Sequence, residues 1–594
     1  MRKLTSILIV LFSVLVCGHA QPATMPWYAH HTWDAVANSI NETMQKNHVV
    51  GISVAVLDDQ RVVWARGFGY ADVAKKVRAT PTTAYRIGSI SKLFVATAVM
   101  QLAEQGRVDI DAPLQTCLPE FAMKSRFSGD GPITPRNVMT HHAGLPTDWL
   151  HGMFDAKPTS FTEYPTLLHD EYPSFPTSTI FCYSNVGYGL LGDMIQHVTG
   201  QPFEAYMDKN LLHPLWMDHA SFALRPDVAE RLSKGYREGK EYDEPPLGNV
   251  PAGNLHASVR DMCRFMAMVL GDGRYRGRQI LKPETLAEML RPQNEDMPLD
   301  LDFRIGLGWI LPPAMAITGY DGPVYGHDGA TLVYNSEMAL LPAEKLGVVV
   351  LSNSAEGMAA GADILAQVCR TALEAKTGKP LPAPTKPPLP KPISLSPEAA
   401  QAITGTYASA LDPIVRITQR GNRLFTRAAG ARLELMPRSG GWFTLRAQPI
   451  FGLFRVSLGD LGQMLFSFQT IAGHDVMVLR AGSVEQVVGE RVRPTPISPA
   501  WKQRLGTYRA TNPDSIVSAK TPINLKEENG FLVLRAKVLD EEASWALSPL
   551  NAHEAIVLGL GRDKGGTVRV ENAEDGELLC YSGYRCVRDK PAPK

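Results

Sequence analysis

The sequence lacks an excess of charge of either sign, because 60 Lys and Arg residues balance 60 Asp and Glu residues among its 594. A balanced chain has no electrostatic footprint for nucleic acid and no polybasic surface for anionic lipid. Long apolar runs are also missing after the N-terminus, where none reaches the ~18 residues that a membrane span needs. We therefore expect a small-molecule or short peptide substrate, no nucleic-acid partner and no stable membrane anchor.

Cysteine is scarce, with 7 in the chain, and no pair has the spacing of a zinc site. His327 and Asp328 form a possible ligand pair, but no third ligand stands nearby, so we expect no metal and no cofactor. Cys580 and Cys586 flank a plausible hairpin turn. They could face each other as a disulfide in an oxidising compartment, or they could stay reduced.

The N-terminus has the three parts of a secretory signal. Basic residues at 2–3 precede an apolar run at 7–16, and small residues precede Gln21. We therefore predict a signal peptide over 1–20 and a periplasmic or secreted mature protein. A lipid-modified Cys17 is disfavoured, because Val16 stands where a small residue is wanted.

A proline-rich stretch divides the chain into two parts of different composition. Residues 378–392 hold seven prolines, which predicts a semi-rigid, extended linker. Upstream of it, strand-like and helix-like segments mix, which indicates an α/β or α+β domain; examples are 51–57 and 346–351 as strands, and 90–105 and 259–270 as helices. Downstream, short alternating runs such as 423–427 and 531–535 indicate β structure.

The downstream part contains a repeat. The segment SPEAAQAITGTY at 396–407 recurs as SPAWKQRLGTY at 498–508, which places Gly405 and Gly506 101 residues apart. A repeat of this length is the size of a domain. We predict a first domain over 25–376, a linker over 377–394, and two small antiparallel β-barrels over 395–492 and 497–590, since closure of a barrel removes the strand edges.

Ser89 and Lys92 stand three residues apart in the segment Ser-Ile-Ser-Lys. Residues at this spacing share a helix face, so Lys92 would lie within reach of the Ser89 hydroxyl. The helix that follows is apolar nearly all round and therefore buried, and burial favours an uncharged lysine that can accept the serine proton. The alternative is a capping serine with a snorkelling lysine.

Two further short motifs could complete a site. Tyr183 and Asn185 precede a glycine-rich apolar helix; the phenol could relay a proton to a leaving group, and the amide could hold Lys92 or a substrate. A core tyrosine with a capping asparagine is the alternative.

Further on, His327, Gly329 and Ala330 lie in strand-like sequence, where the glycine permits close approach of a substrate to the backbone. The Ala330 and Ser89 amides could then form an oxyanion hole, with Asp328 pointing away by strand alternation.

Over residues 30–375 the chain resembles the beta-lactamase-related serine hydrolases. It shares with them the motifs Ser-x-x-Lys, Tyr-x-Asn and His-x-Gly, in this order. The stretch Val-Met-Thr-His-His-Ala-Gly-Leu-Pro at 138–146 and Gly-Leu-Gly-Trp at 306–309 also match. The resemblance implies a beta-lactamase/transpeptidase-like α+β domain, with an antiparallel sheet flanked by helices and a helical lobe. It implies these roles: Ser89 as acylated nucleophile, Lys92 and Tyr183 as the proton-handling pair, Asn185 as an anchor, and His327 with Gly329 and Ala330 as the third element. His141 and His142 would be structural loop residues.

His327 stands where beta-lactamases carry a lysine, and a histidine is mostly neutral at pH 7. The lost cation argues against carboxylate-anchored lactams and favours simpler amides and esters. The layout with two C-terminal barrels resembles D-aminopeptidases, so we expect a hydrolase of D-amino-acid peptides, amides or esters. A beta-lactamase, a D-Ala-D-Ala peptidase and a non-catalytic binding protein that uses the barrels are the alternatives. The loop 559–566 is interpreted as a flexible hairpin rather than as a part of the site.

Overall fold

The computed structural model describes residues 27–29, 32–383, 388–409, 412–428, 431–447, 464–482, 484–539, 541–574 and 576–589. The predicted signal peptide lies outside the described residues. Within these ranges, no helix combines the length and the apolar character that crossing a membrane would require.

An eight-stranded antiparallel sheet is the frame of the N-terminal domain, and its strand order is β10-β11-β12-β13-β14-β1-β2-β3. The central strands β13, β14 and β1 are almost completely buried, which explains why the sequences of β14 and β1 are almost continuously apolar. From one edge to the other the strands are Arg304–Ile305, Ile310–Leu311, Tyr325–Ala330, Asn335–Leu341, Leu346–Ser352, Gly51–Asp58, Arg61–Asp72 and Val77–Arg78.

Helices cover both faces of this sheet. α1 (Thr32–Lys46) and α11 (Gly357–Thr377) pack on one face through a core that includes Ile40 and Ile364. On the other face, α2 (Ser91–Glu104) and α9 (Val259–Leu270) join a larger core that continues into the helical lobe. Both of these helices lie where the sequence predicts them.

The helical lobe and its connections contain short elements. The helices are α3 (Pro135–Met139), α4 (Tyr164–Leu167), α5 (Asn185–Thr199), α6 (Phe203–Met207), α7 (Pro226–Ala229), α8 (Val250–Gly253) and α10 (Pro283–Leu290). Three strand pairs stand apart from the main sheet: β4 (Tyr85–Arg86) with β7 (His256–Ala257), β5 (Gly235–Arg237) with β6 (Lys240–Tyr242), and β8 (Arg274–Tyr275) with β9 (Arg278–Gln279).

Two closed eight-stranded barrels follow, which confirms the predicted α+β domain with two β-barrels. Barrel 1 consists of β15–β22: Gly405–Ser409, Val415–Arg420, Arg423–Ala428, Ala431–Arg438, Trp442–Ala447, Leu465–Ile471, His474–Ala481 and Val484–Val492. Barrel 2 consists of β23–β30: Gly506–Ala510, Ile523–Glu528, Phe531–Val538, Glu541–Pro549, Glu554–Val557, Thr567–Ala573, Gly576–Tyr581 and Tyr584–Arg588.

The repeated segment forms the same substructure in both barrels. A short helix, α12 (Pro397–Ile403) or α13 (Pro499–Gln503), leads into the first strand, and a serine caps each helix. Tyr407 and Tyr508 then donate their hydroxyl protons to the carbonyl of the residue four positions earlier, at 2.9 Å and 2.6 Å. The repeat therefore encodes a helix that packs against the core of its barrel, through Ala400 in barrel 1 and Trp501 in barrel 2.

Of the two alternatives left open for Cys580 and Cys586, the structure shows the reduced one. Both thiols are free. In the register of β29 and β30, Cys580 lies opposite Arg585 and Cys586 lies opposite Leu579. Residues opposite each other share a face of a sheet, so the two cysteines point to opposite faces.

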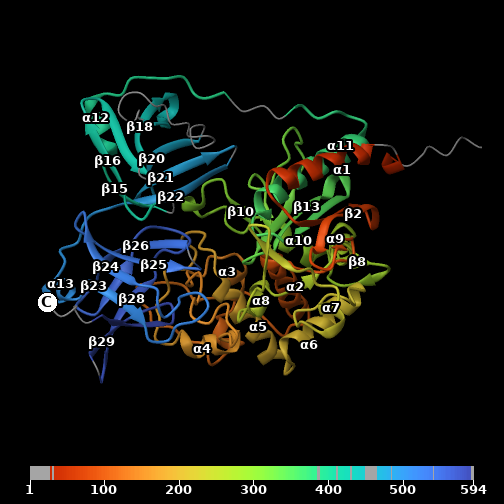
Figure 1. Cartoon of the computed structure of the whole chain (residues 1–594), viewed down its shortest axis with the longest axis horizontal. Helices are drawn as coiled ribbons and strands as arrows, with labels where there is room; N and C mark the ends of the chain where they lie inside the picture. Colours follow the sequence, from red (N-terminus) through yellow and green to blue (C-terminus); the bar gives the residue numbers. More distant parts are fainter. Residues whose placement is uncertain are drawn as a thin grey trace, which may run out of the picture.

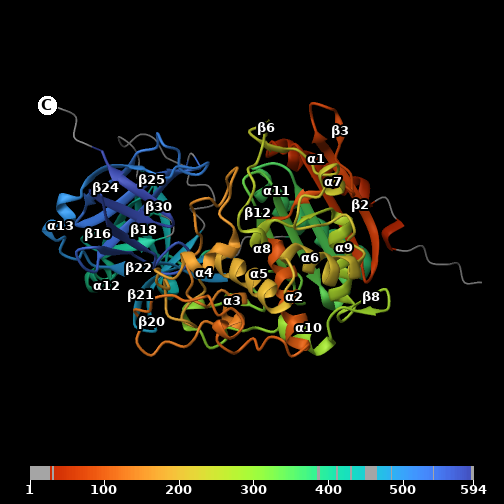
Figure 2. The ribbon, with the colours of Figure 1, turned by 90° about the horizontal axis from the view of Figure 1, so that it is seen from below.

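The two barrels lie together on one side of the N-terminal domain, whereas α1 and β2 lie on the side far from them (Figure 1, Figure 2). Barrel 2 contacts the helical lobe directly, because the Gly152 amide donates to Asp514 at 2.7 Å. The Ser582 hydroxyl of the same barrel accepts from the Leu150 amide at 2.9 Å and donates to the Asp148 carbonyl at 3.0 Å. This contact brings barrel 2 to the segment that precedes α5.

Candidate active site

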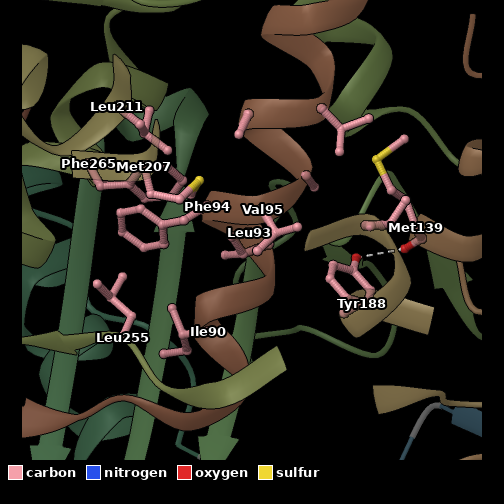
Figure 3. Packing of buried hydrophobic residues seen from close by; sticks show 14 of the residues in the cluster. Ile90, Leu93, Phe94, Val95, Met139, Tyr188, Met207, Leu211, Leu255 and Phe265 are labelled. Carbon is pink, nitrogen blue, oxygen red and sulfur yellow. Dashed lines mark hydrogen bonds between the residues drawn. The ribbon is translucent and has the colours of Figure 1, made fainter. Parts of the chain in front are cut away.

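Ser89 lies in a 3-10 turn (Gly88–Ile90) that runs directly into α2. The first ten residues of α2 are buried, as its apolar sequence predicts. Figure 3 shows Leu93 and Phe94 of this helix packed among residues of other segments, and the rings of Phe94 and Phe265 stack at 4.1 Å. Dense packing therefore fixes the start of the helix, where Ser89 and Lys92 lie.

The Lys92 side-chain nitrogen lies 3.0 Å from Ser89 Oγ and donates to the Ala252 carbonyl at 2.8 Å. Burial lowers the pKa of Lys92 to about 7, although the nearby Asp148 acts in the opposite direction. About half of the side chains are then uncharged at neutral pH, and an uncharged amine has a lone pair that can accept the hydroxyl proton of Ser89.

Tyr183 also lies beside the nucleophile, because the Ser89 side chain is near enough to its hydroxyl to oppose the rise in the pKa of the phenol. Burial raises the pKa of this phenol well above its usual value, so it is protonated at neutral pH. The Lys92 nitrogen lies 4.9 Å from the centre of the Tyr183 ring. The structure therefore brings Ser89, Lys92 and Tyr183 into direct contact.

His141 supports Tyr183 by stacking on its ring and by hydrogen bonds to the residues on either side of it. The two rings stack at 4.2 Å, the Ser184 amide donates to His141 Nδ1 at 3.0 Å, and the Cys182 amide donates to the His141 carbonyl at 2.8 Å. His141 has a positive φ of 62°. Its neighbour His142 lies 2.7 Å from Asp300 in a fully buried pair.

Strand β12 passes directly beside the nucleophile because two glycines permit it. A Cβ on Gly329 would lie 2.2 Å from the Ile87 carbonyl oxygen and 2.9 Å from the Ser89 nitrogen. A Cβ on Gly88, which has a φ of 53°, would lie 2.6 Å from the Ala330 nitrogen. The amides of Ser89 and Ala330 therefore lie in the same region, as an oxyanion hole requires.

His327 is buried on the same strand, and its Nδ1 donates to the carbonyl of Asp328 at 2.5 Å. Burial lowers the pKa of His327 below its usual value, and the charge of Lys92 adds to that shift while Asp328 opposes it. The imidazole is therefore neutral at pH 7, with Nε2 as a hydrogen-bond acceptor. The Asp328 side chain is exposed, as strand alternation predicts.

Asn185 is held by a carboxyl group of the site, a partner that the sequence does not reveal. It begins α5, and its amide group donates to Asp148 at 2.8 Å, while Lys92 is anchored by the Ala252 carbonyl instead. Asp148 is partly buried, and the desolvation of its carboxyl group together with the charge of Asp563 raises the pKa of that group. Asp148 therefore adds a carboxyl group to the site that the three sequence motifs do not contain.

The loop of barrel 2 between β27 and β28 reaches the site, so its interpretation as a plain flexible hairpin is wrong. The Arg562 guanidinium lies over the Tyr183 ring, 5.1 Å from its centre. The Asp563 amide donates to the Thr147 hydroxyl at 2.9 Å, and the Cys182 thiol donates to the Gly561 carbonyl at 3.6 Å. The glycines of this loop let its backbone lie close to the helical lobe; a Cβ on Gly565 would lie 2.3 Å from the carbonyl oxygen of a lobe residue.

The sequence reasoning missed Asp148, Ala252 and Arg562. Asp148 follows the matched stretch 138–146 by two residues, and Ala252 acts through its backbone, which has no sequence signature. Arg562 could have been noticed as one of the charged residues enclosed by glycines in a loop. It contacts a residue almost four hundred positions away, which a local pattern does not reveal.

The sequence model of the family described as Beta-lactamase matches residues 36–369. Protein flp of Staphylococcus aureus strain MRSA252 is 27% identical over 322 residues, which cover 53% of this chain and 61% of that protein. The chain thus spans about three fifths of the length of that relative. The D-alanyl-D-alanine-carboxypeptidase/endopeptidase AmpH of Escherichia coli K12 is 27% identical over 359 residues, which cover 58% of this chain and 90% of AmpH.

Solved structures resemble the fold over a longer part of the chain. An octameric penicillin-binding protein homologue from Pyrococcus abyssi matches 77% of this chain and 100% of its own, with a TM-score of 0.51 and 24% identity. The crystal structure of SurE with D-Leu matches 78% of this chain and 99% of its own, with a TM-score of 0.55 and 24% identity. At this identity the likeness concerns the fold alone.

Proposed function

The chain belongs to the beta-lactamase family, and we propose that it is a serine hydrolase that forms an acyl-enzyme at Ser89. The bonds it cleaves are amides or esters of small substrates, with D-amino-acid peptides and amides among them. The distance of 3.0 Å between the nitrogen of a buried Lys92 and Ser89 Oγ carries this proposal. It supports an activated hydroxyl, because the amine can take the proton as the oxygen attacks.

The proposed reaction uses the groups around Ser89 in turn. Ser89 Oγ attacks the substrate carbonyl, and its proton passes to Lys92. The amides of Ser89 and Ala330 stabilise the negative oxygen of the tetrahedral intermediate. As the bond between the carbonyl carbon and the leaving group breaks, Tyr183 gives a proton to the leaving amine or alcohol and takes the serine's proton from Lys92 in return. Water then hydrolyses the ester to Ser89, and the proton returns to the serine through the same pair.

The neutral His327 supports simple amides and esters over lactams. A lysine at this position would attract a carboxylate by charge, whereas the neutral imidazole offers only hydrogen bonds. The alternative, a D-Ala-D-Ala peptidase, rests on the name of AmpH, which shares 27% identity with this chain. A beta-lactamase is less favoured because β12 lacks the cation.

The predicted export and the domain limits belong to the same proposal. A signal peptide over 1–20 would place the hydrolase in the periplasm or outside the cell, where cell-wall peptides and other D-amino-acid derivatives occur. The domain limits of 25–376, 395–492 and 497–590 are proposed as the units of this architecture.

The test is a substrate profile of the purified mature chain against D- and L-amino-acid anilides, short acyl esters and nitrocefin. We expect hydrolysis of anilides or esters at a rate that Ser89→Ala abolishes, and little turnover of nitrocefin. Undiminished hydrolysis by the Ser89→Ala variant would reject the proposal. A profile dominated by nitrocefin would select the beta-lactamase alternative, and a lack of all turnover would favour a binding protein.

A further inference from the structure

One carboxylate links the two chain segments that supply the oxyanion amides. Glu244 lies in the connection between β6 and α8, and each of its carboxylate oxygens contacts a different segment. We propose that Glu244 sets the separation of the Ser89 and Ala330 amides and is therefore a positioning residue for the hydrolysis. This inference rests on the proposed function, because it concerns the oxyanion hole of the same reaction.

The first contact is with the strand that leads into the nucleophile turn. Glu244 Oε2 accepts a hydrogen bond from Arg86 Nη1 at 2.5 Å, and 4% of the Glu244 side chain and 9% of the Arg86 side chain are exposed. Arg86 ends β4, three residues before Ser89, and the Ile87 amide between them donates to the Leu255 carbonyl at 2.9 Å. A displacement of Arg86 would therefore move the Ser89 amide, because only a short and fixed stretch of backbone separates them.

The second contact is with the turn that follows β12. Glu244 Oε1 accepts from the Leu332 amide at 2.5 Å and from the Val333 amide at 3.2 Å. Leu332 lies two residues after Ala330, which ends β12. Hydrogen bonds from backbone amides to an ionised carboxylate are stronger than those between neutral groups. The carboxylate that holds the nucleophile strand therefore also holds the segment that carries the second oxyanion donor.

The two segments meet so closely that a small shift would matter. A Cβ on Gly88 would lie 2.6 Å from the Ala330 nitrogen, and a Cβ on Gly329 would lie 2.9 Å from the Ser89 nitrogen. Oxyanion donors act when they lie about 2.7–3.1 Å from the oxygen that becomes charged. If one segment moved relative to the other, one amide would therefore leave this range.

The backbone around Glu244 is anchored to the helical lobe. The Pro246 carbonyl accepts from the Asp155 amide at 3.1 Å, and the Gly248 amide donates to the Met153 carbonyl at 2.9 Å. The residue directly after Glu244 is also a proline, which restricts the backbone conformation of Glu244 itself. The carboxylate therefore has a fixed position from which it can hold both segments.

Glu244 acts without lining the substrate cavity. Thr331 and Leu332 contribute to the wall of a cavity of about 1060 Å³ between the lobe, the segment after β12 and barrel 2, and Glu244 does not. Ser336 also joins β13 to the nucleophile turn, since its hydroxyl donates to the Ile87 carbonyl at 2.7 Å. That contact does not include the amides after β12, which have Glu244 as their acceptor. A change at Glu244 should therefore alter the oxyanion amides and leave direct substrate contacts in place.

The experiment compares an oxygen ester with the matching thionoester, in which sulfur replaces the carbonyl oxygen, using the full mature chain. Sulfur is a weak hydrogen-bond acceptor, so a correctly spaced oxyanion hole favours the oxygen ester. Glu244→Gln keeps an oxygen for the two amides but loses the charge that pairs with Arg86. We expect kcat/KM for the oxygen ester to fall about 10- to 100-fold, and its ratio to kcat/KM for the thionoester to fall about tenfold. A loss of folded enzyme alone would lower both values equally and leave the ratio unchanged.

Arg86→Gln and the double variant Arg86→Gln with Glu244→Gln test the link between the two segments. Each single variant breaks the same ion pair, so we expect similar ratios in both and no further fall in the double variant. The double variant also removes the unpaired buried charge, so it keeps the test available if a single variant does not fold. Glu288→Gln is the matched control, because Glu288 also pairs with an arginine, Arg136, at 2.5 Å in the same domain and contacts neither segment.

The outcomes separate this inference from the proposed function. A wild-type ratio of oxygen ester to thionoester in Glu244→Gln and in the double variant overturns the inference, while Ser89-dependent hydrolysis in the same assay leaves the proposed function standing. If the wild type turns over neither ester but a fluorophosphonate labels Ser89, the labelling rate replaces the ratio. A tenfold slower labelling in Glu244→Gln than in Glu288→Gln then supports the inference, and an equal rate overturns it. A wild type without turnover or labelling overturns both proposals.

Discussion

The nitrogen of Lys92 lies 3.0 Å from Ser89 Oγ in a helix whose first turns are buried. The Ala252 carbonyl holds the same nitrogen at 2.8 Å, so the amine has a fixed position. Burial also keeps a large share of it uncharged, because the lysine pKa falls to about 7. The pair therefore joins a nucleophile to a base whose state changes near neutral pH.

Hydrolysis should increase with pH around neutrality. Only the uncharged amine accepts the Ser89 proton, and with a pKa of about 7 this form is lost as the pH falls below that value. We expect kcat/KM to drop about tenfold per pH unit below 6 and to level off above 8. The measurement is a pH profile of kcat/KM for the best substrate between pH 5 and 9.

Lys92→Arg is the variant that tests this assignment, because an arginine remains protonated throughout that range. We expect it to lose at least about 10²-fold in rate, in line with the loss of a general base. Lys76→Arg, at an exposed position, is the control. A rising limb that persists unchanged in Lys92→Arg would show that another group is titrating.

Gly329→Ala should remove activity without unfolding the protein. The added Cβ would lie 2.2 Å from the Ile87 carbonyl oxygen and 2.9 Å from the Ser89 nitrogen, so β12 and the nucleophile turn have to separate. The oxyanion donors would then be misplaced, and we expect a loss of about 10²–10³ in kcat. Gly131→Ala, whose Cβ meets its nearest atom at 3.3 Å, should behave as wild type. Normal kinetics in Gly329→Ala would contradict the placement of β12.

His141 should act as a positioning residue for Tyr183. His141→Asn suits the positive φ of 62°, and its side-chain oxygen can accept from the Ser184 amide, but the stacked ring is lost. We expect kcat to fall about tenfold while KM changes little, because the phenol becomes less well oriented. Thermal unfolding should change less in this variant than in His141→Phe, which leaves a buried amide without an acceptor. A wild-type kcat in His141→Asn would refute the role.

Asp514 should hold barrel 2 on the helical lobe. Its carboxylate accepts from the Gly152 amide at 2.7 Å and from the Tyr584 hydroxyl at 2.8 Å. Asp514→Ala leaves these donors without a partner, at a cost of about 1–3 kcal/mol each where they are buried. We expect a lower unfolding temperature and faster proteolysis of the barrel, with Asp589→Ala as the control. Unchanged unfolding and proteolysis would show that other contacts dominate this interface.

The helices and strands of the core follow from local patterns, and so they are predictable. The apolar run at 51–57 forms β1, and the amphipathic segment at 259–270 forms α9. Both are predictable because the spacing of apolar residues along the sequence indicates whether a strand or a helix face is buried. The repeat around Gly405 and Gly506 gives the two barrels, because each copy forms the same helix and first strand. These features depend on neighbours in the sequence.

The sequence does not reveal the parts of the site that depend on contacts between residues far apart in the chain. Ser89, Lys92 and Tyr183 come together, and the spacing of Ser89 and Lys92 already indicates that pair. Asp148 takes the Asn185 amide, and Arg562 reaches Tyr183 only because barrel 2 docks on the lobe. The choice between a disulfide and free thiols at Cys580 and Cys586 was open for a related reason, since strand register and not proximity in sequence decides which faces they occupy.

The most direct test of the central claim is mass spectrometry of the protein after reaction with a fluorophosphonate. We predict one adduct, located on Ser89 in the digested protein and absent from Ser89→Ala. Ser91→Ala is the matched control, because Ser91 is a buried serine two positions away whose hydroxyl accepts from the Leu255 amide. An adduct that persists in Ser89→Ala, or an active enzyme without any adduct on Ser89, would contradict the account.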